Sequence, residues 1–250
     1  MIIDCHVHLQ GSGLDPELVE SAAGLGVERL CCSSLGRKWS YEPTPDVFTQ
    51  ANDDVAETMR RHPDLVLGFC YLNPVYTDES LVEMRRCVEE LGMVGVKLWV
   101  AVYADDPRVF PLVEQAIEYR IPVLQHAWHK ATGNLPHESD PLHVADLARR
   151  YREADIIMAH IGGDWERGIA AVKDCPNVLV DTSGSIIDMG MVERSVEVLG
   201  ANRVLFGSDA HGVDLSVALA KVLDAEISES DRQLILGGNM QAVLDRRAPR

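Results

Sequence analysis

The chain has 250 residues, of which 46% are hydrophobic, and its 39 acidic against 23 basic side chains give a net charge of −16. A chain this acidic repels phosphate backbones and anionic lipid surfaces, which argues against nucleic acid or a membrane as a partner. No long apolar run is present, and the N-terminus lacks the basic region of a signal peptide. Because no linker rich in Pro, Gly or Ser interrupts the chain, we expect one domain over residues 1–250.

The cysteines stand at positions 5, 31, 32, 70, 87 and 175, without the spacing of a metal-binding C-x-x-C pair. In a chain of this length they predict reduced, mostly buried thiols and a cytoplasmic location. Cys31 and Cys32 are adjacent, so on a strand they would point to opposite faces and would not form a disulfide.

Short apolar runs rich in Val, Ile and Leu recur along the chain. They cover residues 1–9, 27–34, 65–73, 93–100, 121–127, 154–162, 177–184 and 203–210. Segments with helical periodicity lie between them, and residues 215–246 continue as helix. This alternation predicts an α/β protein with the fold of a (β/α)8 TIM barrel. A doubly wound open sheet is the alternative, although GSG at 11–13 is a weak signal for the glycine-rich turn of that fold.

The first run, MIIDCHVHL, carries two histidines one residue apart. Because successive side chains of a strand point to opposite faces, Asp4, His6 and His8 are predicted to share one face. Ile3, Cys5 and Val7 are then predicted to share the other face. Two imidazoles held side by side are either a metal clamp or a coincidence.

Polar side chains also follow later runs. Lys97 belongs to the fourth run, His126 and His160 end the fifth and sixth, and Asp209 ends the eighth. In a barrel these strand ends converge on one mouth, where catalytic residues lie. Each residue alone would more often be structural, as a hydrogen-bonded histidine or a helix N-cap. Their repetition instead predicts a divalent-metal site, with Zn²⁺ as the expected ion and one or two ions per chain.

Four further side chains are candidates for substrate contact. His129 and His211 come just after predicted site residues, and Trp99 and Trp128 lie near strand ends. Residues 127–140 form a long loop that should wall the mouth of the barrel.

Another long loop follows the second run. Residues 34–46 contain RKWSYEP, which offers cationic and aromatic groups together. The simpler interpretation, which we favour from the sequence, is a solvated loop.

Several segments together resemble the landmarks of the amidohydrolase superfamily: DCHVH, GVKLW, VLQHAWH, HESDP, IIMAHIGG, VLVDTSG, RVLFGSDAHG and ILGGNMQAVL. The resemblance runs from residue 1 to about residue 245. It is closest to the amidohydrolase-2 branch of metal-dependent hydrolases and nonoxidative decarboxylases. It implies that His6, His8 and His126 are metal ligands and that Asp209 is a ligand that also handles a proton. His160 would bind a second metal or act in catalysis.

The resemblance leaves the role of Lys97 open. In binuclear relatives a strand lysine, carboxylated by CO2, bridges two metals, and GVKL places Lys97 at that position. Many members of the amidohydrolase-2 branch look similar here and hold one metal. A free ammonium repels a cation, so Lys97 would be a ligand only when carboxylated. Unmodified, it would pair with Asp209 or bind a substrate carboxylate.

These residues predict a metal-dependent hydrolase that cleaves an amide, ester or lactone bond in a small organic molecule. A bound Zn²⁺ lowers the pKa of its water from about 15.7 to about 7. Asp209 is placed to take the proton of that water and pass it to the leaving group. The metal, or His160, would polarise the scissile carbonyl.

Three alternatives remain. The first is nonoxidative decarboxylation of an aromatic or unsaturated acid, in which Trp99, Trp128, Arg37 or Lys130 would hold the ring and the carboxylate. The second is a TatD-like deoxyribonuclease, but those enzymes have a carboxylate at the fourth strand, where this chain has a lysine. The third is a metal-bearing barrel without catalytic activity. Exposed apolar surface on the barrel helices could also support a homodimer.

Overall fold

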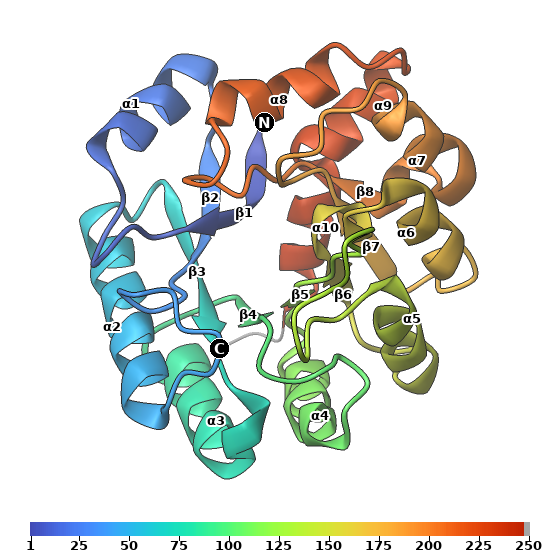
Figure 1. Ribbon diagram of the computed structural model, residues 1–250. Helices are drawn as coiled ribbons and strands as arrows, with labels where there is room; N and C mark the ends of the chain where they lie inside the picture. The colour runs from blue at the N-terminus through green and yellow to red at the C-terminus, as the bar shows by residue number, and fades with distance from the viewer. Residues whose placement is uncertain (248–250) are drawn as a thin grey trace.

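The computed structural model describes residues 1–247, and it confirms the predicted barrel. Parallel strands form one sheet in chain order, and helices form a ring outside them (Figure 1). The strands are β1 (Ile3–His8), β2 (Arg29–Ser33), β3 (Val66–Tyr71), β4 (Gly95–Leu98), β5 (Val123–Gln125), β6 (Ile156–Met158), β7 (Val178–Asp181) and β8 (Val204–Leu205). Each strand lies inside one of the predicted apolar runs, because each run is too short for a helix and is followed by a turn signal.

Several of the helices between the strands begin at side chains that cap them. Asp15, Asp140 and Asp214 accept hydrogen bonds from the first backbone N–H groups of the helices that follow. The α-helices are α1 (Pro16–Leu25), α2 (Pro45–Arg61), α3 (Thr77–Arg85), α4 (Phe110–Tyr119), α5 (Pro141–Arg150), α6 (Trp165–Val172), α7 (Met191–Leu199), α8 (Leu215–Leu223), α9 (Glu229–Gln233) and α10 (Asn239–Asp245). The tail over 215–246 is helical, as expected: Ser228 caps the start of α9, and a π-helical turn at Leu234–Gly238 joins α9 to α10.

The barrel is nearly closed between β1 and β8, just beyond the end of β8. The backbone N–H of Asp209 donates to the carbonyl of His6 at 2.8 Å, and that of His8 donates to the carbonyl of Ala210 at 2.8 Å. These bonds hold Asp209 beside the two histidines. The seam of the barrel therefore brings the first and last predicted site segments together.

Two large apolar clusters make up most of the core, and a small third cluster contains Tyr71. The inner cluster lies inside the barrel and contains Ile3, Cys5, Cys31, Phe69, Leu124, Ile157, Leu179 and Leu205, together with Met240 and Val243 of α10. The larger outer cluster packs the other face of the strands against the helices, and Cys32 belongs to it. Cys31 and Cys32 therefore face opposite ways, as predicted.

The predicted alternation along β1 is wrong in its second half. Ile3 and Cys5 lie in the inner cluster, but Val7 lies in the outer one. The cause is a register shift against β2 between Asp4 and Val7. Asp4 instead uses one carboxylate oxygen to accept the backbone N–H of His6 at 3.0 Å.

The state of the cysteines and the lengths of the helices can be compared with the predictions of buried thiols and of no membrane-spanning segment. All six cysteines are free and buried. No helix among residues 1–247 is both long and apolar enough to cross a bilayer. A cytoplasmic location stays a prediction.

Candidate metal-binding active site

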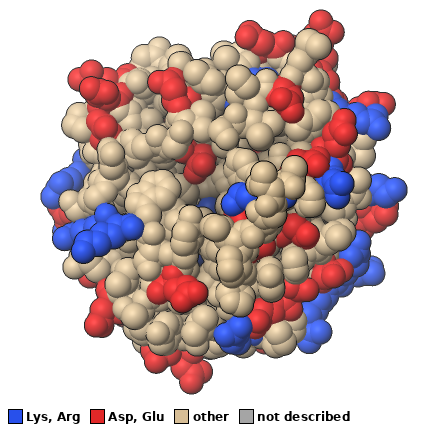
Figure 2. Space-filling model, in the orientation of Figure 1, with Lys and Arg blue, Asp and Glu red and all other residues tan. Residues whose placement is uncertain are grey.

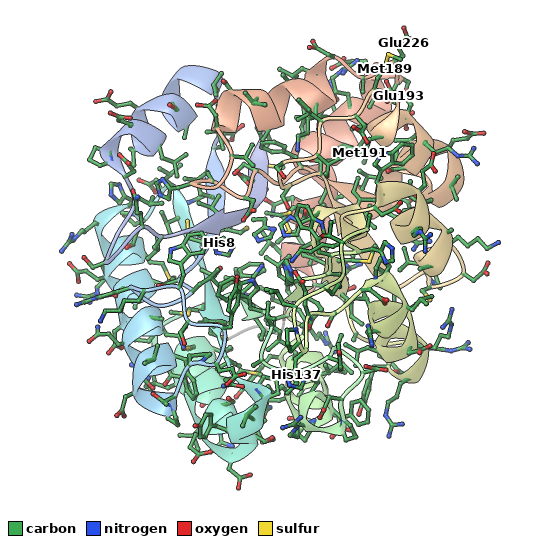
Figure 3. All side chains as sticks on the ribbon, viewed as in Figure 1. His8, His137, Met189, Met191, Glu193 and Glu226 are labelled. Carbon is green, nitrogen blue, oxygen red and sulfur yellow. The ribbon has the colours of Figure 1, made fainter. Side chains whose placement is uncertain are left out.

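His6 and His8 meet at the end of β1, as their spacing predicts. Their Nε2 atoms lie 3.1 Å apart. Oδ1 of Asp209 lies 3.3 Å from Nε2 of His8 and 3.8 Å from Nε2 of His6. Both imidazoles are buried. Three ligand atoms from opposite ends of the sequence therefore face one another inside the barrel mouth, and Figure 3 places His8 near the centre of the ring of helices.

The far sides of both rings are held by hydrogen bonds. Nδ1 of His6 lies 3.0 Å from Oδ2 of Asp181 and 3.0 Å from Oγ of Ser183. Nδ1 of His8 lies 3.0 Å from Oγ of Ser33. The Asp181 carboxylate only accepts, so His6 donates through Nδ1 and keeps the lone pair on Nε2. This is the arrangement that carboxylate partners give to metal-binding histidines.

Lys97 enters the same site from β4. Its side chain is buried, and Nζ lies 2.8 Å from Nε2 of His6. Burial lowers the pKa of Lys97 to about 8, although Asp209 and Asp181 oppose that shift. The sequence had suggested an ion pair with Asp209, but Lys97 contacts His6 instead.

His126 stands just after β5 with a different partner from the one expected of a metal ligand. Its Nε2 lies 3.0 Å from Oε1 of Glu138, whose two oxygens also accept from Nζ of Lys130 at 2.7 and 2.6 Å. Burial acts to raise the pKa of Glu138, but the bonds from His126 and Lys130 lower it to about 2. The structure thus places His126 on the wall of the site with its Nε2 toward a carboxylate, and its role as a ligand stays a prediction.

His160 follows β6 in a short 3₁₀ turn. Its backbone is left-handed, with φ of 60°, and Asp209 has φ of 63°. Such conformations are uncommon outside glycine and gather at functional sites. The backbone N–H of His160 donates to Asp181 at 2.8 Å, and Nδ1 lies 2.8 Å from Oγ of Ser183. Asp181 and Ser183, at the end of β7, therefore orient His6 and His160 together.

A cavity of about 260 Å³ opens above these residues. His8, Lys97, His126, His160 and Asp209 contribute to its lining. Figure 2 shows that most charged side chains lie toward the edge of this face, and that a few acidic and basic groups lie among uncharged residues around the central hollow.

Aromatic rings form much of the wall of this cavity. Trp99 lies 6.1 Å from Trp39 and 4.3 Å from Tyr41, measured between ring centroids. Trp128 lies 5.0 Å from His160 on another part of the wall. Trp99 and Trp128 therefore line the cavity, and their contact with substrate stays a prediction.

The loop over residues 34–46 is not the simple solvated loop that we favoured. Trp39 and Tyr41 line the cavity, whereas Arg37 turns away and forms two bonds of 2.9 and 2.8 Å with Asp54. Arg37 is therefore no candidate for holding a substrate. The aromatic residues of RKWSYEP were the available signal for a cavity wall.

The sequence suggested that His129 and His211 contact the substrate. Neither residue lines this cavity. His129 lines a neighbouring groove. Burial lowers the pKa of His211, and its Nε2 is buried with no hydrogen-bond partner. Strand ends locate a residue along the barrel axis, but the course of the following loop decides where its side chain points.

Burial favours the neutral form of His8, His126 and His160. It lowers the pKa of His8 to about 4 and also lowers the pKa values of His126 and His160. Burial raises the pKa of Asp209, but the bond from His8 and the other neighbouring histidines bring it well below its usual range. Neutral imidazoles and an ionised carboxylate are the forms that bind metal.

These residues fit a divalent cation. Nε2 of His6, Nε2 of His8 and Oδ1 of Asp209 lie within 4.8 Å of one another. A set of imidazole nitrogens with one carboxylate oxygen suits Zn²⁺ and other first-row divalent ions. The Lys97 ammonium opposes such a cation, because its charge lies beside His6.

A family model described as Amidohydro_2, Amidohydrolase, matches residues 3–246. The chain therefore belongs to the amidohydrolase-2 family, which confirms the resemblance seen in the sequence and makes the protein a member of an enzyme family.

Curated relatives add named activities. The chain is 31% identical over 233 residues to a 2-amino-3-carboxymuconate-6-semialdehyde decarboxylase of Dictyostelium discoideum, a match that covers 78% of this chain but 65% of that protein. It is 24% identical over 242 residues to a gamma-resorcylate decarboxylase of a Polaromonas strain, covering 77% and 74%. It is 26% identical over 242 residues to a 2-keto-4-carboxy-3-hexenedioate hydratase of a Sphingobium strain, covering 78% and 70%.

Solved structures confirm the fold. A 2,6-dihydroxybenzoate decarboxylase in complex with 2,6-dihydroxybenzoate matches with a TM-score of 0.82 at 16% identity, over 98% of both chains. A dihydroxybenzoic acid decarboxylase from Polaromonas, with bound manganese and the inhibitor 2-nitroresorcinol, matches with a TM-score of 0.76 at 21% identity, over 94% of this chain and 88% of the other.

These comparisons overturn the hydrolase prediction. The matching relatives are decarboxylases and a hydratase, not hydrolases of amide, ester or lactone bonds. The histidines and the aspartate at the strand ends prepare a metal site, but they do not specify which bond is broken. That choice depends on the walls of the cavity, which come from loops.

Proposed function

We propose that the protein is a metal-dependent nonoxidative decarboxylase of a small aromatic or unsaturated carboxylic acid. The observation that carries the proposal is a cavity with aromatic walls above a cluster of histidine and carboxylate ligand atoms. A planar ring fits between aromatic side chains, and an acid group can pair with the ammonium of the buried Lys97 at the floor of the cavity. The decarboxylases among the relatives support this chemistry.

In this proposal one divalent ion, Zn²⁺ or Mn²⁺, is held by His6, His8 and Asp209, with His126 as a further ligand. A bound divalent cation supplies a positive charge that neutralises and orients the substrate's acid group and an adjacent oxygen. Asp181 and Ser33 keep the two β1 imidazoles aimed at the site from behind.

The substrate would lie with its acid end toward the floor of the cavity. Lys97 is buried there, and its ammonium can pair with the carboxylate. Trp99 and Trp128 would contact the faces of the ring from the walls. Lys130 is engaged by Glu138 at the edge, so Lys97 is the better candidate for the acid group.

The reaction needs one proton at the carbon that bears the carboxylate. We propose that Asp209 and His160 relay this proton from water to the carbon, because both line the cavity, and Asp209 is ionised and His160 neutral at rest. Protonation of that carbon is followed by cleavage of its bond to the carboxylate, whose electron pair returns to the ring or double bond. CO2 leaves, and solvent then restores the proton to the site.

The test is product analysis by NMR in D2O with carboxyl-labelled 2,6-dihydroxybenzoate and metal-supplemented protein. The proposal predicts labelled CO2 and one deuterium on the carbon that carried the acid group. Asp209→Asn should lower turnover by at least about 10²-fold, the size of effect that loss of a proton-transferring group produces. Addition of water to an unsaturated acid without CO2 release would instead indicate a hydratase. Activity on none of a panel of ring and unsaturated acids would contradict the proposal.

A further inference from the structure

A second hollow lies directly beside the cavity. This outer groove has a volume of about 520 Å³, and Trp128 and Lys130 line both spaces. Trp165 and Ile186 add apolar surface to the outer groove, and His129 lies in its wall. The inner cavity alone is smaller than the roughly 300–1,000 Å³ that small-molecule sites ordinarily span. A ligand that fills the inner cavity would therefore reach the outer groove at the edge of Trp128.

Trp128 is a fixed partition between the two spaces. Its backbone N–H donates to the carbonyl of Ser139 at 2.9 Å. Its ring packs so closely on Gly163 that a Cβ at that position would lie 2.5 Å from Cδ1 of the indole. Because the ring is held from behind, one edge can contact an inner ligand while the other contacts an outer one.

Trp165 is also held in place. Its Nε1 donates to Oδ2 of Asp188 at 3.0 Å, which fixes the indole in the wall of the groove. An indole that is already ordered loses little conformational freedom when a ligand binds against it. The groove therefore presents Trp128 and Trp165 to any part of a ligand that extends out of the inner cavity.

The charges of the groove select against a second acid group. Asp164, Glu166 and Asp188 line it. Lys130 is the lysine among its lining residues, and both oxygens of Glu138 already engage its Nζ. An anionic extension would meet carboxylates without a free cation, whereas an uncharged ring would meet apolar surface.

We propose that the outer groove is a substrate subsite for an uncharged aromatic or apolar extension, carried on the ring opposite the acid group. This inference rests on the proposed decarboxylase function, because the acid end must lie at the inner floor. It assigns Trp165 as a residue that determines specificity, although it lies outside the inner cavity.

The test compares 2,6-dihydroxybenzoate with its 4-phenyl and 4-(4-carboxyphenyl) derivatives. We expect kcat/KM to be about tenfold higher for the phenyl acid than for the parent, a factor that corresponds to about 1.4 kcal/mol. The carboxyphenyl acid should lose that gain. Trp165→Ala should remove the gain for the phenyl acid and leave the parent unchanged, whereas Tyr103→Ala, an exposed aromatic residue outside both spaces, should leave both unchanged.

Binding of the two decarboxylated products, resorcinol and 5-phenylresorcinol, gives a readout that needs no turnover. Tighter binding of the phenyl compound, lost in Trp165→Ala, would support the subsite. Turnover of the parent acid with no gain for the phenyl acid, or equal binding of the two products, would overturn the subsite and leave the decarboxylase proposal intact. Turnover of none of the three acids would count against the decarboxylase proposal, and the product pair would still decide on the groove.

Discussion

Nζ of Lys97 lies 2.8 Å from Nε2 of His6, although the two residues are separated by 91 positions in the sequence. The contact joins β4 to β1 across the barrel mouth. It places the ammonium of Lys97 beside Nε2 of His6, a proposed metal-binding atom. An unmodified Lys97 is therefore consistent with one ion, whereas a carboxylated Lys97 could bridge two.

Replacement of Lys97 by methionine tests its role. If Lys97 is an unmodified ammonium, Lys97→Met should bind metal at least as tightly as the wild type, because a like charge is removed. The KM of the acid should rise by about 10- to 100-fold, the loss expected for a hydrogen bond to a charged group. Metal titration and steady-state kinetics measure the two effects, with the exposed Lys38→Met as control. Loss of bound metal would instead show that a carboxylated Lys97 is a ligand.

The second prediction concerns Asp181, whose carboxylate accepts a hydrogen bond from Nδ1 of His6 and so orients that ring toward the metal site. Asp181→Asn keeps the shape of the side chain but removes the negative charge that holds Nδ1 of His6. Metal affinity should fall by about 10- to 100-fold, as it does when such supporting partners are lost. The measurement is competitive metal binding against a chelating dye. Asp106→Asn, at an ion pair with Arg108 on the surface, is the matched control and should bind metal normally. Unchanged affinity in Asp181→Asn would refute this supporting role.

Gly163 and Gly133 form a matched pair for the packing of Trp128. Both have positive φ, of 77° and 95°, so alanine is strained at either position. A Cβ at Gly163 collides with the indole of Trp128, whereas a Cβ at Gly133 meets open space. Gly163→Ala should therefore cost about 1–3 kcal/mol more in unfolding free energy than Gly133→Ala, the range for overpacking. Chemical denaturation measures this difference, and equal costs would contradict the close packing of Trp128.

The lowered pKa of Glu138 predicts that the free energy of unfolding depends on pH. Its pKa is lowered to about 2 in the folded protein, so its contribution is complete above the unfolded value of about 4.3 and is lost as pH falls through about 2. At neutral pH Glu138→Gln should be less stable than the wild type by about 2 kcal/mol. That difference should shrink between about pH 4.3 and about pH 2. Urea unfolding at several pH values measures it, with the exposed Glu153→Gln as control. A difference that does not change with pH would rule out the ion pairs as its source.

Much of the fold could be predicted because its signals are local. Each strand of the barrel is a short apolar run, and several helices begin at aspartate or proline. The meeting of His6, His8 and Asp209 was also predictable, because a barrel brings all strand ends to one mouth. The direction in which the side chains of β1 point was not predictable in its second half, since the register shift between Asp4 and Val7 depends on pairing with β2.

The rest of the site lies in loops, where spacing carries little information. Glu138 reaches His126 only because the loop over residues 127–140 folds back on itself. Ser183 and Asp181 showed no pattern that separates a supporting side chain from an ordinary strand end. The aromatic wall formed by Trp39 came from a segment that composition alone assigned to solvent.

The most direct test of the account is the metal content of protein purified without chelator, determined by elemental analysis. We predict one divalent ion per chain, and the double variant His6→Ala, His8→Ala should lose it. Two ions per chain would contradict the single-ion site and require a carboxylated Lys97. No metal, with no uptake of added Zn²⁺ or Mn²⁺, would contradict the central claim that the histidines of β1 and Asp209 hold a catalytic metal.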